Sequence, residues 1–93
     1  VTDTTRETDL SDAVSGHINQ TAVARGYDSA LSVVSYGTSK KLKWKGEAVV
    51  FTDWRDDCWE YSYAEFSKME AGTRTWPTPV EFVLELPVIV WPS

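Results

Sequence analysis

The side chains best suited to covalent chemistry are the single histidine, His17, and the single cysteine, Cys58. A nucleophile and its general base must lie within hydrogen-bonding reach, and nothing in the local sequence brings His17 close to Cys58, a serine or a threonine. Cys58 also falls at the centre of an apolar helical face, where a thiol is typically buried and inert. We therefore expect neither residue to be catalytic.

Carboxylates offer a second possibility. Asp56 and Asp57 are adjacent, and Glu60 lies one helical turn later, so a pair of them could act as acid and base. At about 100° per residue, however, these side chains lie opposite the aromatic face of their helix, which favours a solvated surface. One histidine and one cysteine do not supply a zinc site, and the five glycines form no phosphate-binding loop. The sequence therefore predicts no enzyme, no metal site and no cofactor.

Arg55 is the residue that fits its expected surroundings least well. On a helical wheel it falls within the apolar face, beside Phe51, Cys58 and Trp59. A guanidinium there needs a carboxylate, an aromatic ring or a path to water. Asp28 is the candidate carboxylate, so one prediction is a structural Asp28–Arg55 ion pair. The alternative is that Arg55 extends to the edge of the apolar face and is solvated.

Charge is spread unevenly along the chain. The net charge of −5 disfavours nucleic acid as a partner, and residues 1–12 contribute −3 of it, from four acidic residues and one arginine. Residues 38–46 are basic instead, with four lysines around Leu42 and Trp44. This connector could be a patch for nucleic acid or an acidic partner. It could also be a solvated loop whose Leu42 and Trp44 turn inward, and this second interpretation is the one we expect.

The spacing of apolar residues predicts an all-α protein, a small helical bundle in one domain over residues 10–87. Residues 1–9 are too polar to offset the entropy of ordering, which predicts a flexible acidic arm. A first helix is expected over about 10–36, broken at Gly26 and restarting with Asp28 or Ser29 as its N-cap.

Two further helices are predicted. Residues 47–71 contain no Gly or Pro and should form a long helix, with an apolar face covering about half its circumference. A short helix over 79–86 should be capped by Thr78 with Glu81. We expect it to lie across the two longer elements.

After Pro87, residues 88–93 are predicted to form an extended apolar tail. The tail and two edge residues of the long helix are candidate partner-binding residues: Trp54, Tyr61, Val88, Ile89, Val90 and Trp91. The long helix offers more apolar surface than two shorter elements can cover, so a protein partner could bury the remainder. The alternative is that the tail folds back and covers Trp54 and Tyr61 itself.

An ordered set of short motifs carries a family resemblance. The motifs are Ala24-Arg25-Gly26-Tyr27-Asp28-Ser29, Ser35-Tyr36, Gly46-Glu47-Ala48, Trp54-Arg55-Asp56, Trp59, Ala71-Gly72-Thr73-Arg74, Pro77 and Glu85-Leu86-Pro87. Together they resemble a small helical domain of tailed-bacteriophage proteins, often found at the C-terminus of proteins encoded in tail-fibre and tail-fibre-assembly regions. The resemblance spans roughly residues 14–87. It implies a setting in a phage particle or its assembly, and no catalytic residues.

Three functions are therefore considered. The first is a non-enzymatic phage protein-interaction module, a virion or tail-fibre accessory protein that binds a phage tail or fibre protein. The second is a tail-fibre assembly chaperone that is absent from the particle, and the third is an inhibitor of a host defence protein. We expect the first, with synthesis in the host cytoplasm, location in the virion, and a homo-oligomer as one option. No apolar stretch reaches the roughly 18 residues of a membrane span, and no signal peptide is visible.

Overall fold

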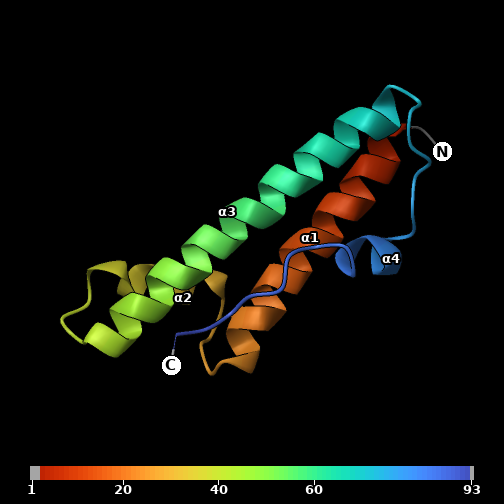
Figure 1. Ribbon diagram of the computed structural model, residues 1–93. Helices are drawn as coiled ribbons and strands as arrows, with labels where there is room; N and C mark the ends of the chain where they lie inside the picture. Colours follow the sequence, from red (N-terminus) through yellow and green to blue (C-terminus); the bar gives the residue numbers. More distant parts are fainter. Residues whose placement is uncertain (1–2, 93) are drawn as a thin grey trace.

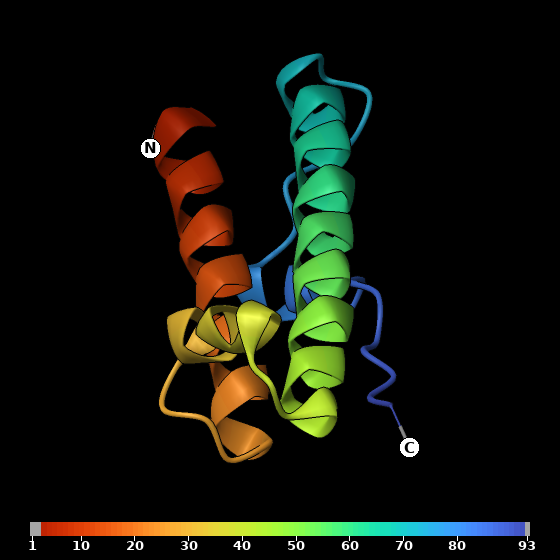
Figure 2. The same ribbon diagram turned by 90° about the vertical axis from the view of Figure 1, so that its left-hand side faces the viewer.

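The computed structural model describes residues 3–92, with side chains from Arg6 onwards. Over this range the elements are α1 (Asp3–Ala24), α2 (Ala30–Ser35), the short 3-10 helix η1 (Tyr36–Thr38), α3 (Leu42–Glu70) and α4 (Pro79–Val83), with no strand among them. The predicted all-α class is therefore confirmed. Helices α1 and α3 run side by side in opposite directions, and α2 lies across them near one end (Figures 1 and 2).

Helix α1 starts well before the predicted position. It begins at Asp3, so the prediction of a flexible arm over residues 1–9 is wrong for residues 3–9, and Val1 and Thr2 lie outside the described residues. Leu10, Val14 and Ile18 are all buried at a spacing of four residues and attach α1 along α3. Anchoring by Leu10 lets the polar turns before it continue the helix.

The break after α1 follows the predicted signals. Gly26 adopts a φ of 105°, a conformation that favours glycine, and the Tyr27 amide turns back to the Ala22 carbonyl at 3.1 Å. The Ser29 hydroxyl then caps α2 by accepting a hydrogen bond from the Ser32 amide at 3.2 Å. The predicted interruption and cap are confirmed.

Helix α3 begins at Leu42, five residues earlier than predicted. Its buried side chains repeat every three or four positions once the polar Ser62 is included with the apolar residues Ala48, Phe51, Trp54, Cys58, Phe66 and Met69. This stripe is narrower than the predicted half circumference, since Trp59 and Tyr61 remain partly exposed. Helix α1, the α2–η1 segment and the residues after Pro87 together cover the buried face of α3.

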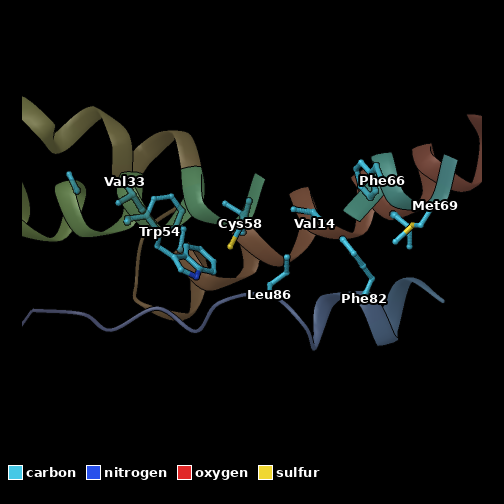
Figure 3. Packing of buried hydrophobic residues seen from close by; sticks show 13 residues of the cluster. Val14, Val33, Trp54, Cys58, Phe66, Met69, Phe82 and Leu86 are labelled. Carbon is cyan, nitrogen blue, oxygen red and sulfur yellow. The ribbon is translucent and has the colours of Figure 1, made fainter. Parts of the chain in front are cut away.

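Helix α4 is short and closes the core from one side. The predicted capping box is present: the Thr78 hydroxyl accepts from the Glu81 amide at 3.2 Å, and the Glu81 carboxylate accepts from the Thr78 amide at 3.0 Å. Phe82 is fully buried and its ring stacks on Phe66 at 5.5 Å. Figure 3 shows Phe82 and Leu86 pointing from this segment toward the two long helices.

The molecule is elongated, measuring 47 × 20 × 19 Å. The start of α1 meets the end of α3 at one end, and the end of α1 meets the start of α3 at the other (Figure 1). Each end of the molecule thus carries a different part of the sequence.

Candidate interaction site

A buried carboxylate links the two long helices near the start of α3. Glu47 is only 4% exposed, and both of its oxygens are hydrogen-bonded. Arg25 donates from Nε to Oε2 at 2.9 Å and also from Nη2, while the Tyr27 hydroxyl donates to Oε1 at 2.7 Å. A buried charge is costly unless it is paired in this way. The Arg25–Tyr27–Glu47 cluster therefore fixes the turn after α1 onto α3.

The pKa values of the cluster follow from these contacts. Burial opposes ionisation of Glu47, but the hydrogen bonds from Arg25 and Tyr27 outweigh it and hold its pKa below the ordinary value. Burial, followed by the hydrogen bond to Glu47, raises the pKa of Tyr27 to about 12. Glu47 is therefore ionised and Tyr27 protonated at neutral pH.

An open recess of about 570 Å³ lies beside this cluster. Aromatic and cationic side chains line it, among them Tyr27, Tyr36, Lys43, Trp44 and Arg25. The Tyr36 ring lies 5.6 Å from Tyr27 and 5.5 Å from Trp44, between ring centres. Such walls suit contact with apolar or anionic groups of a partner and supply no nucleophile. Sequence reasoning placed Arg25, Tyr27 and Glu47 in the resembling motifs but did not pair them.

The predicted Asp28–Arg55 ion pair is wrong. Arg55 Nη2 lies 3.2 Å from Asp56 Oδ1, and its side chain remains 34% exposed at the edge of α3. Asp28 is exposed beyond the Gly26 turn and forms no ion pair with any described residue. Arg25, placed just before that turn, makes the connection between the helical halves instead. Arg55 instead extends to the edge of the apolar face, as in the alternative prediction.

The tail folds back over α3, which was the alternative to a free tail. Trp54 is 6% exposed, and its Nε1 donates to the Pro87 carbonyl at 2.7 Å. The Trp91 ring stacks on Phe51 with 6.0 Å between ring centres, and Ile89 packs on the same core. Trp54 is therefore a core residue, and predicting it as part of a partner surface was wrong. Ile89 and Trp91 are partly buried against that core, and a partner role for their exposed parts stays a prediction.

Tyr61 is also engaged within the chain. Its hydroxyl donates to Glu85, and Arg74 bridges Glu85 and Glu65, the latter at 2.6 Å. This network holds the segment after α3 against the helix. Tyr61 is therefore not free for a partner as predicted, although its ring is partly exposed.

Apolar side chains remain exposed on the outer side of α4 and the tail. Val80, Leu84, Val88 and Val90 are between 74% and 86% exposed, and we call them the α4–tail face. Val88 and Val90 alternate with the inward-facing Ile89 and Trp91, as expected for an extended segment. A groove of about 340 Å³ between α1 and α4 adjoins this face. The predicted partner role of Val88 and Val90 stays a prediction.

The lysine-rich connector also differs from expectation. Leu42 is 84% exposed and Trp44 43% exposed, so the prediction that both turn inward is wrong. From Leu42 onwards the segment forms the first turns of α3 instead of a loop, and successive helical side chains point to all sides of the helix. The structure thus presents two apolar side chains among four lysines.

The residues considered for chemistry are separate in the structure. His17 packs edge-on against Trp54, with 5.8 Å between ring centres. Cys58 is buried, and burial followed by the charge of Asp57 raises its pKa to about 11, away from the thiolate that a nucleophile needs.

Within residues 3–92, no group of three His, Cys, Asp or Glu side chains is placed to hold a metal ion. Likewise, none of the described helices has the length and apolar character to span a membrane. That the chain is not an enzyme stays a prediction.

Comparisons were made with protein-family models, with curated proteins and with solved structures. None of the three found a match to this chain.

Proposed function

We propose that this protein is a non-enzymatic protein-interaction module of a tailed bacteriophage. In this proposal it is an accessory protein of the tail or tail fibre, is made in the host cytoplasm, resides in the virion, and binds a phage tail or fibre protein. The motif resemblance supports the phage setting. The α4–tail face is the single observation that supports protein binding.

Burial of exposed aliphatic side chains against a partner would favour binding. Val80 and Leu84 lie four residues apart on one side of the α4 segment, and Val88 and Val90 extend the apolar surface along the tail. Fully burying one such side chain stabilises an assembly by roughly 1.5–3 kcal/mol. Grouped exposed aliphatic side chains are a common mark of an interface. The inner neighbours Ile89 and Trp91 hold the face in place, so a partner would meet a preformed surface.

The test is affinity purification of the tagged chain from phage-infected cells, followed by quantitative mass spectrometry. The wild type is expected to recover a tail or fibre protein. Val88→Ser with Val90→Ser should lower that recovery by about tenfold or more, given the loss of two buried side chains. The matched control is Val23→Ser with Val49→Ser, because these valines are each 51% exposed and lie away from the face. Equal recovery by both variants would contradict a binding role for the face.

Mass spectrometry of purified particles separates the three functions considered. The proposal expects the chain at a defined copy number in the particle. Capture of a fibre protein from infected cells, combined with absence from the particle, would indicate an assembly chaperone instead. Capture of a host defence protein alone would indicate an inhibitor.

A further inference from the structure

One end of the molecule carries a cluster of exposed positive charge. Lys40, Lys41, Lys43 and Lys45 surround the exposed Leu42 and the half-exposed Trp44, and we call residues 40–45 the basic tip. None of the four lysines forms an ion pair with a described residue. Because two apolar side chains lie among these lysines, the basic tip suits an acidic protein surface as its partner. Such a partner can pair with the lysine charges and bury the apolar side chains at the same time.

Local structure accounts for one of these lysines: Lys43 lies one helical turn before Glu47, and its charge helps to lower the pKa of that carboxylate. The lysines lie at the start of α3, where the helix dipole is already positive and cations are unfavourable. Lys41 occupies the N-cap without a side-chain hydrogen bond, and the first turn holds no acidic residue. Lys40, Lys41 and Lys45 form no ion pair with a described residue, and an anionic surface would supply their missing partner.

The opposite end of the same molecule carries negative charge. Asp9, Asp12 and Glu70 are exposed there, and with Glu7 they make up what we call the acidic end. The pKa of Glu7 is raised chiefly by its hydrogen bond with Glu70, which shows how closely these acids crowd where α1 and α3 meet. Tyr63, 59% exposed, lies two helical turns before Glu70 on the same side of α3 and adds an apolar contact surface.

We infer that the basic tip of one molecule docks against the acidic end of a second copy. Residues 25–47 hold five basic and two acidic residues, a net charge of +3, whereas the rest of the chain holds four basic and twelve acidic, a net charge of −8. The long dimension of 47 Å far exceeds the roughly 8 Å screening length of physiological salt, so each end acts independently. The contact joins unlike surfaces, so molecules can add head to tail in a row, or two can pair antiparallel with the contact made twice.

The inference is independent of the proposed function and concerns a different surface. Sedimentation velocity of the full chain over a range of concentrations tests it. Wild type should associate in about 50 mM NaCl and dissociate largely in about 500 mM, because exposed charge pairs are screened by salt. Lys41→Glu with Lys45→Glu should abolish association while leaving the fold intact, since glutamate is favourable at a helix start. Asp9→Lys with Glu70→Lys should abolish it from the other side.

Mixing the two charge-reversed variants gives the decisive measurement. Each variant keeps one native surface, so the mixture should associate although neither variant does so alone. Asp53→Lys with Asp57→Lys is the matched control, because it changes net charge equally at two exposed positions in the middle of α3 and should associate at least as well as wild type. A wild type that stays monomeric in low salt would overturn the inference. So would association that the Lys41/Lys45 variant retains, or a basic tip that binds only phosphatidylserine vesicles or duplex DNA.

Discussion

At Glu47, a carboxylate is buried only one helical turn from the lysines of the basic tip. Arg25 and Tyr27 make that position tolerable by donating to both oxygens. Ser62 is the other buried polar residue among those described, and its hydroxyl donates a hydrogen bond to the Cys58 carbonyl, one turn away, at 2.7 Å. Glu47 instead depends on residues twenty and twenty-two positions away, so it joins distant parts of the chain.

Removing Arg25 should therefore cost considerable stability. Arg25→Ala leaves the Glu47 carboxylate buried without its cation, and Arg25 also loses its stacking on the Trp91 ring, 5.0 Å away. Because Arg25 is 35% exposed, we expect a loss of about 2–4 kcal/mol rather than the full penalty of a buried pair. Urea denaturation of the wild type and of the variant measures this difference in the free energy of unfolding. Arg55→Ala, the control, should change the free energy of unfolding by less than about 0.5 kcal/mol.

The same residue makes stability depend on pH. The pKa of Glu47 is lower in the folded protein than its ordinary value of 4.5. Its contribution is therefore fully present above about pH 4.5 and is lost as the pH falls through the folded-state pKa. We expect the free energy of unfolding to decrease on acidification below that pH. Glu47→Gln should be less stable at neutral pH and show a shallower decrease. An unchanged slope would show that other carboxylates, such as Glu85, carry the dependence.

At the scale of the element, the tail has an inner side that packs on α3 and an outer side that is exposed to solvent. Trp91→Ala should remove the stack on Phe51 and destabilise the protein by about 1–3 kcal/mol. For a chain of this size, each kcal/mol lowers the melting temperature by roughly 4–8 °C. Val90→Ala, at the exposed neighbouring position, should leave the melting temperature nearly unchanged. Equal effects of the two substitutions would mean that the tail does not pack as described.

Elements defined by local signals could be predicted from the sequence. The break at Gly26, the Ser29 cap and the Thr78–Glu81 capping box each depend on a few adjacent residues, and all three are confirmed. Features that depend on tertiary contact could not be predicted in the same way. The helical state of residues 3–9 requires the packing of Leu10, and the choice between Arg25 and Arg55 requires knowing where the Gly26 turn leads.

At the scale of the whole molecule, charge is unevenly distributed along the sequence. Because α1 and α3 are antiparallel, this distribution gives the two ends of the molecule opposite charge (Figure 1). Small-angle X-ray scattering can follow this shape. In high salt and at low concentration we expect a radius of gyration near the 14.8 Å of the Cα trace, slightly enlarged by side chains and hydration. In low salt the value should rise with concentration. A larger radius that persists in high salt on dilution would contradict the packed arrangement of α1 and α3.

The way the tail covers Trp54 also has a consequence for biosynthesis. Pro87, Ile89 and Trp91 cover Phe51 and Trp54, yet they are synthesised more than thirty residues after them. Closure over this aromatic cluster must wait until residues 87–91 have left the ribosome. Before then, these residues cannot shield Phe51 and Trp54 from water. The growing chain therefore passes through a stage in which this aromatic surface is accessible to chaperones or to another growing chain.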